Sequence, residues 1–94
     1  MKRLQDLKNV GKEALKDLSL LGVTSVEDLV TCDPTILFLK LEKLSKQRQD
    51  PCVWDVFAAI IHEAKTGEAT LWWKWTPQRK ALQKLGKFKH FFDR

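Results

Sequence analysis

No stretch of this sequence is apolar for long enough to cross a membrane. The longest apolar run covers residues 56–61, whereas a spanning helix needs roughly 18 apolar residues. The opening MKRLQDLKN lacks the apolar centre of a secretory signal. Cysteine is scarce, since Cys32 and Cys52 are the only two, and two fit reduced thiols better than a disulfide scaffold. We therefore expect a cytoplasmic protein.

Recognisable metal and catalytic patterns are also missing. The two His and two Cys residues form no C-x₂-C or H-x₃-H pair, and His62-Glu63 lacks the second His of a zinc-protease motif. Cys52 and His62 share a helical face, but ten residues of helix separate them by about 15 Å. The sequence thus predicts no metal, no cofactor and no enzyme. A small cysteine beneath a helix cap is the favoured interpretation of Cys52, and a thiol-dependent enzyme is a distant alternative.

Acidic residues are nearly absent from the end of the chain. Residues 74–94 hold seven basic side chains and one acidic side chain, a net +6, whereas residues 1–73 hold ten basic and eleven acidic ones, a net −1. The whole excess of +5 therefore lies in a basic tail, residues 76–94, and its flank. Such asymmetry indicates a polyanion partner or a solvated tail.

Apolar residues recur at helical spacing through most of the chain, and no segment shows a long strand pattern. We expect one all-α domain over residues 1–94, a compact bundle of five or six short helices. The expected helices are 2–7, 12–21, 26–31, 34–45, 52–65 (the central helix, its unit starting at 51) and 78–85. Caps at Thr24 or Ser25, Asp33-Pro34 and Asp50-Pro51 would start three of them, and Gly22 would end one. Residues 87–94 would fray.

The stretch around which we expect the domain to be organised is the hairpin unit, residues 2–23. Asn9-Val10-Gly11 forms its turn, and Asn and Gly are residues that tolerate a positive φ. The next helix buries Ala14, Leu18 and Leu21 on one stripe, widened by Leu15. Its first amides have no intrahelical partner and lie at the positive end of the helix dipole, which suits a phosphate.

The hairpin sequence NVGKEALKDLSLLGV resembles the helix-hairpin-helix motif of DNA repair and recombination proteins, with Asn9 and Gly11 at the two Gly positions and Gly22-Val23 at the close. Its Asn-hydrophobic-Gly form is also similar to the C-terminal domain of TfoX competence regulators. QRQDPCVWDVF (residues 47–57) and WWKW (residues 72–75) resemble the small bacterial pathogenicity-locus family, some of whose members are called mitomycin-resistance proteins. The resemblance covers about residues 4–76 and implies a SAM-like, helix-hairpin-helix type of fold.

The Trp-rich segment, residues 71–75, is a second candidate surface. In a strand-like stretch Trp73 and Trp75 would share one face, opposite Trp72 and Lys74. The cluster either closes the core or stacks bases beside a basic surface. That possible secondary surface comprises Trp72, Lys74, Arg79, Lys80 and Lys84.

The function predicted from these features is DNA binding without sequence preference, in an accessory protein of DNA maintenance. The contacts would go to the backbone of duplex DNA. The residues predicted to bind are Lys8, Asn9, Gly11, Lys12, Glu13 and Lys16, with amide donors at positions 11–13. The alternative is a protein–protein adaptor without a nucleic-acid role; neither function involves a membrane or a small-molecule substrate.

Overall fold

The computed structural model describes residues 2–91, and all regular structure within that range is helical. The elements are η1 (Leu4–Asp6), α1 (Lys12–Leu20), α2 (Val26–Val30), α3 (Pro34–Ser45), α4 (Cys52–Thr66), η2 (Trp72–Trp75) and α5 (Thr76–Lys84), where η marks a 3-10 helix. The radius of gyration is 12.5 Å, close to the value of about 12 Å expected for a compact chain of this length. The predicted compact all-α fold is confirmed.

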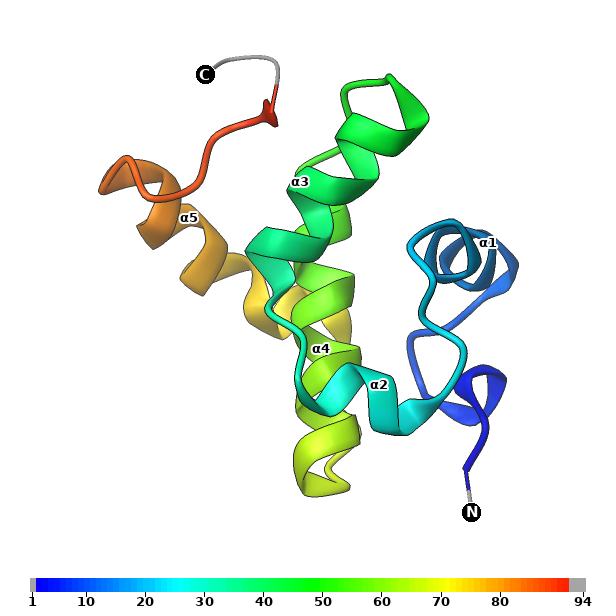
Figure 1. The fold of residues 1–94 in the computed structure, drawn as a ribbon. Helices are drawn as coiled ribbons and strands as arrows, with labels where there is room; N and C mark the ends of the chain where they lie inside the picture. The colour runs from blue at the N-terminus through cyan, green and yellow to red at the C-terminus, as the bar shows by residue number, and fades with distance from the viewer. Residues whose placement is uncertain (1, 92–94) are drawn as a thin grey trace.

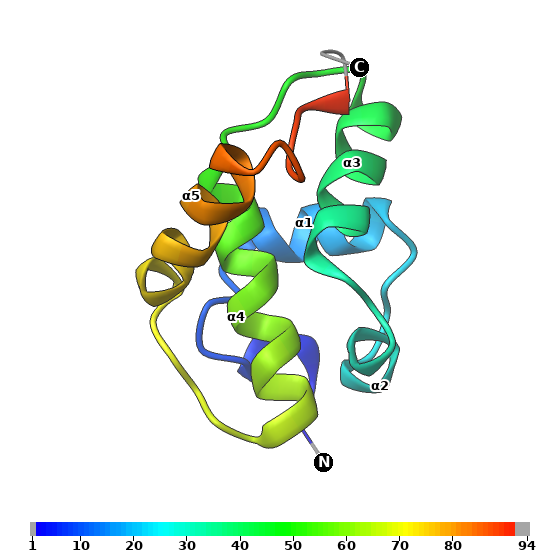
Figure 2. The same ribbon diagram turned by 90° about the vertical axis from the view of Figure 1, so that its left-hand side faces the viewer.

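Helix α4 is the central element, and the other helices pack around it (Figures 1 and 2). Its Phe57 and Ile60 are almost fully buried. They pack in one cluster with Leu18 of α1, Leu29 of α2 and Phe38 of α3. The predicted central helix is thus correct. None of the helices in residues 2–91 has both the length and the apolar character needed to span a membrane.

Helix starts follow the caps that the sequence predicts. The Ser25 hydroxyl accepts a hydrogen bond from the Asp28 amide at 3.2 Å, and the Asp28 carboxylate accepts one from the Ser25 amide at 3.2 Å, which forms a capping box. Asp33 Oδ1 accepts from the Thr35 amide at 2.8 Å, with Pro34 at the first helical position. Local chemistry therefore fixes where α2 and α3 begin.

Helix α1 ends at a glycine in the left-handed conformation, as predicted. Gly22 has φ +79°, a value that side chains with a Cβ rarely adopt. The Val23 amide donates to the Leu18 carbonyl at 2.9 Å and the Gly22 amide to the Ser19 carbonyl at 3.1 Å. These two bonds form a Schellman motif, which turns the chain from α1 toward α2.

Two local expectations about exposure and backbone shape are wrong. Leu15 does not widen the buried stripe of α1, since it is 36% exposed. Residues 72–75 form η2 rather than a strand-like stretch, so their side chains do not alternate between two faces.

The chain after α5 is anchored rather than frayed, as far as the structure describes it. Phe88 is 4% exposed, and its ring meets Phe38 edge to face with centroids 4.9 Å apart. The buried Glu42 carboxylate accepts hydrogen bonds from the His90 ring at 2.6 Å and the Phe91 amide at 2.6 Å. The expected fraying is therefore wrong for residues 87–91, and its remainder, residues 92–94, lies outside the described residues.

Candidate nucleic-acid interface

The start of α1 presents backbone donors at the surface. The first intrahelical bond runs from the Leu15 amide to the Gly11 carbonyl at 2.9 Å, so the amides of residues 11–14 precede the hydrogen-bonded ladder. Within residues 2–91, none of these four amides has a hydrogen-bond acceptor. Gly11, Lys12 and Glu13 are exposed. The residues that carry these unpaired N–H groups thus lie at the surface of the domain.

The backbone of this turn differs from the expected one. Gly11 has φ −93° and ψ −171°, an extended conformation that any residue adopts. None of residues 9–11 has a positive φ, so that expectation is wrong. The chain turns instead through hydrogen bonds of the 3-10 type, including one from the Val10 amide to the Leu7 carbonyl at 3.2 Å. A Cβ built on Gly11 would meet no other atom within 4 Å.

Asn9 links the hairpin to the Trp-rich segment. Its Nδ2 donates to the Thr70 carbonyl at 2.6 Å, and its Oδ1 accepts from the Trp72 amide at 3.1 Å. Both ends of the carboxamide are thus occupied by the protein. Through its side chain Asn9, predicted as a binding residue, joins two segments that are 61 to 63 positions apart in sequence.

Glu63 holds the other side of the hairpin. This residue of α4 is 3% exposed, and its carboxylate accepts from the Lys8 amide at 3.0 Å and from Lys2 Nζ at 3.0 Å. Sequence reasoning missed it. The available signal was a carboxylate in the most apolar helix of the chain, because a buried carboxylate requires donors.

Three lysines flank the exposed amides, and two acidic residues share the helix with them. Lys8, Lys12 and Lys16 are exposed, and no ion pair within residues 2–91 includes any of them. Glu13 and Asp17 line hollows shared with α3 and α4. Partial burial and repulsion from Glu13 raise the pKa of Asp17, while Lys16 opposes that rise.

The Trp-rich segment divides into a residue packed against the core and a pair outside the core cluster. Trp75 packs against the core and donates through Nε1 to the Thr70 hydroxyl at 2.9 Å. Trp72 is half-buried and Trp73 is 52% exposed, and neither joins the core cluster. Their rings meet edge to face at 5.6 Å and 84°. Packing into the core is therefore confirmed for Trp75 alone.

Arg79 does not belong to the secondary basic surface. It is 7% exposed, and its Nε lies 2.7 Å from Oδ1 of the fully buried Asp55. Asp55 Oδ2 also accepts from the Thr76 hydroxyl at 2.6 Å. The prediction of a surface role for Arg79 is wrong because the guanidinium neutralises a buried carboxylate. Lys74, Lys80 and Lys84 are exposed.

Cys52 and His62 lie apart, as their separation on one helix requires. Burial and a hydrogen bond to Asp50, together with its negative charge, raise the pKa of the Cys52 thiol despite its place at the start of α4. His62 Nε2 lies 2.7 Å from Glu68 Oε1. Cys52 is thus a partly buried, protonated thiol at neutral pH, without a histidine beside it.

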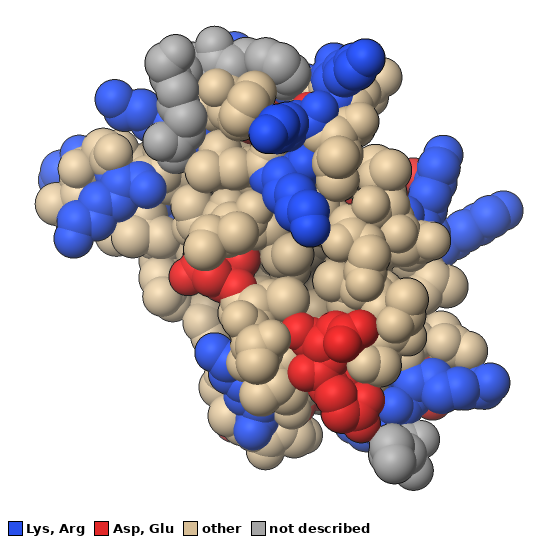
Figure 3. Space-filling view, viewed as in Figure 1, with Lys and Arg blue, Asp and Glu red and all other residues tan. Residues whose placement is uncertain are grey.

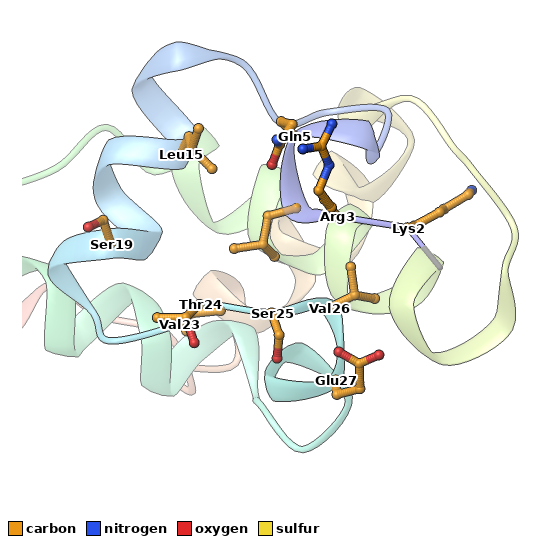
Figure 4. A pocket seen from close by; sticks show the side chains of 11 residues that line it. Lys2, Arg3, Gln5, Leu15, Ser19, Val23, Thr24, Ser25, Val26 and Glu27 are labelled. Atoms are coloured by element: carbon orange, nitrogen blue, oxygen red, sulfur yellow. The ribbon is translucent and has the colours of Figure 1, made fainter.

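An open groove of about 520 Å³ lies between η1, α1 and α2 (Figure 4). Leu15 and Ser19 stand on its α1 wall, opposite Val23 and Val26. Lys2, Arg3 and Glu27 are among its other lining residues. The groove explains why Leu15 is exposed, and its lining is mainly apolar.

Charge is unevenly spread over the face that carries α2 and α3. Acidic side chains gather over α2, whereas Lys and Arg side chains project mostly from the upper half of that face (Figure 3). In Figure 2 the segment leading to η2 lies on the opposite side of α4 from α2 and α3, and Asn9 joins the turn before α1 to that segment. The helices η1 and α1 themselves border α2 across the groove.

Together, these features define a small all-α domain in which exposed residues begin α1 and a tryptophan pair, half-buried at Trp72 and exposed at Trp73, follows the segment bound by Asn9. The chain belongs to the pathogenicity locus family (Cdd1), whose model matches residues 1–81. It is 33% identical over 79 residues to a protein of Streptomyces lavendulae named mitomycin resistance protein McrB. That match covers 84% of this chain and 75% of the relative. No solved structure gives a significant match.

Proposed function

We propose that this protein binds the DNA backbone without sequence preference, as an accessory protein in DNA maintenance. The binding unit would be a helix-hairpin-helix formed by η1, the turn at residues 7–11, and α1. The observation that carries the proposal is the set of exposed amides at Gly11, Lys12 and Glu13, which have no acceptor among residues 2–91. A phosphate oxygen would supply that acceptor.

Electrostatics around these amides favour an anion. The N-terminus of α1 carries the positive end of the helix dipole, and the exposed Lys8, Lys12 and Lys16 add charge beside it. Backbone amides and lysines contact phosphates, which are the same at every base pair. Such a site would therefore position the protein on DNA without reading its sequence.

Anchoring of the hairpin on both sides supports the same proposal. The Glu63 carboxylate on α4 accepts a hydrogen bond from the Lys8 amide. The Asn9 side chain accepts one from the Trp72 amide of η2. The turn between them is fixed before any ligand arrives. A preformed donor set loses less conformational entropy on binding.

The second candidate is a protein–protein adaptor. The observation that favours it is the groove between η1, α1 and α2, where Leu15 is exposed and Val26 is half-buried. An apolar groove of this kind suits an amphipathic partner helix. The relative's name suggests resistance to mitomycin as a cellular readout for either candidate.

A salt titration of binding to mixed-sequence duplex DNA tests the first candidate. Affinity should fall steeply with salt, with a logarithmic slope of about −0.9 for each phosphate neutralised. Lys12→Ala and Lys16→Ala should each make the slope shallower by about 1, whereas Lys43→Ala on α3 should leave it unchanged. An affinity that stays constant between about 50 and about 200 mM salt would contradict backbone binding.

A further inference from the structure

We infer that Trp72 and Trp73 form a platform for unpaired bases, so that the preferred ligand is nucleic acid with a single-stranded segment. The inference rests on the proposed backbone contact at Gly11–Glu13 and names the class of nucleic acid that it serves. Aromatic side chains bind single strands by stacking on bases, and neighbouring cations hold the phosphates.

The exposure of this pair is the first observation. Tryptophan is the largest apolar side chain, and small domains bury it when they can. Trp54 and Trp75 of this chain do pack in or against the core, whereas Trp73 is 52% exposed and Trp72 stays outside the core cluster. An edge-to-face pair also leaves ring faces open that a stacked pair would cover.

The rigidity of the backbone beneath the rings is the second observation. Asn9 binds the Trp72 amide, Trp75 donates to the Thr70 hydroxyl, and the Thr76 hydroxyl donates to the buried Asp55. The segment is thus fixed before, within and after η2. Exposed rings on a fixed backbone form a surface with one shape, as a recognition site requires.

The charges around the tryptophan pair indicate which class of ligand it would bind. Lys74 follows the pair directly, Lys8 adjoins Asn9, and both are exposed and outside every ion pair described for residues 2–91. Of the nearby carboxylates, that of Glu63 is paired with Lys2 and that of Glu68 lies 2.7 Å from the His62 ring, whereas the exposed Glu13 on α1 is in no ion pair described for residues 2–91. An aromatic surface bordered by free lysines suits an anionic chain with flat, apolar bases.

The platform also adjoins the proposed phosphate donors. Trp72 meets Asn9 through a 3.1 Å hydrogen bond, and Gly11 follows Asn9 by two residues, a reach of at most about 7 Å. A strand whose phosphate binds the Gly11 amide therefore passes beside the tryptophan pair. In an intact duplex the bases are stacked on each other, so the rings would contact only bases that have left the duplex.

The test compares Trp73→Ala with Ile36→Ala, which removes another exposed apolar side chain, from α3 on the other side of α4. Each variant is titrated with an oligothymidylate of about 20 nucleotides and with a blunt duplex of equal length. Trp73→Ala should weaken single-strand binding about 5- to 150-fold, the range for losing one stacked base. Its duplex affinity, and both affinities of Ile36→Ala, should stay within about twofold of the parent.

A parallel pair, Gly11→Glu and Gly11→Gln, separates the failure of this inference from the failure of the proposed backbone contact. If Gly11→Glu binds duplex more weakly than Gly11→Gln while Trp73→Ala binds the single strand normally, the backbone contact stands and the base platform is wrong. If the parent binds neither probe, both are wrong. If Trp73→Ala weakens both probes equally, the pair contacts something common to both, and the single-strand preference is overturned.

Discussion

Asn9 Oδ1 accepts the Trp72 amide at 3.1 Å, and through this bond the turn before α1 is joined to η2. The same carboxamide donates to the Thr70 carbonyl at 2.6 Å. The sequence predicts that Asn9 supports the turn through a positive φ. In the structure it supports the turn through the hydrogen bonds of its side chain. The candidate interface depends on this junction, because the exposed amides lie on one side of it and the tryptophan pair on the other.

Asn9→Ala should lower the free energy of unfolding by about 1–3 kcal/mol, because it leaves the Trp72 amide and the Thr70 carbonyl without their partner. Urea denaturation measures this loss. Lys8→Ala is the matched control: it keeps the backbone amide that binds Glu63, and its stability should stay within about 0.5 kcal/mol of the parent. Equal stability of the two variants would show that the junction contributes nothing.

Arg79→Ala should destabilise the fold strongly, by about 3–5 kcal/mol, because it leaves the buried Asp55 carboxylate without its cation. Lys80→Ala, which removes an exposed cation one residue away, should change stability by less than about 0.5 kcal/mol. Thermal or urea unfolding distinguishes them. If Arg79→Ala is as stable as the parent but binds DNA more weakly, Arg79 acts as a surface residue, and the stabilising role inferred from its contacts is wrong.

Glu42 makes the anchoring of residues 87–91 dependent on pH. Burial favours the neutral carboxyl, but hydrogen bonds from the His90 ring and the amides of Phe91 and Gln49 outweigh it and lower the pKa of Glu42 below its ordinary value of 4.5. A lowered folded-state pKa stabilises the fold above the unfolded value, and this contribution is lost as pH falls through the folded one. Stability should therefore decrease as the solution is acidified below the ordinary value.

Urea unfolding of the parent and Glu42→Gln, from about pH 7 to about pH 3, isolates this contribution. Cap hydrogen bonds, chiefly from the amides of Thr24 and Cys52, also lower the pKa values of Asp28 and Asp50, so both proteins should lose stability in acid. At neutral pH Glu42→Gln should be less stable by roughly 2–3 kcal/mol. The difference should shrink as pH falls, and a constant difference would show that Glu42 does not titrate with folding.

The features predicted correctly are those whose causes are local in sequence. Ser25 with Asp28, and Asp33 with Pro34, fix helix starts through groups within three positions of each other, and Gly22 ends α1 by its own backbone freedom. A cap can be read from a few neighbouring residues.

The errors concern side chains whose partners lie far along the chain. Asn9 meets Thr70 and Trp72, Glu42 meets His90 across 48 positions, and Arg79 meets Asp55 across 24. No local pattern specifies such a pairing, because it depends on how the helices pack. Charge alone therefore misplaced Arg79 on the surface, and turn chemistry alone did not reveal the side-chain bonds of Asn9.

The central claim is that the amides of Gly11, Lys12 and Glu13 donate to phosphate oxygens. Amide chemical shifts recorded by NMR during titration with duplex DNA test it most directly. The resonances of these three residues should move furthest, whereas that of Val10, whose amide already donates to Leu7, should move less. Shifts confined to the groove between η1, α1 and α2, or no shifts at all, would contradict the claim.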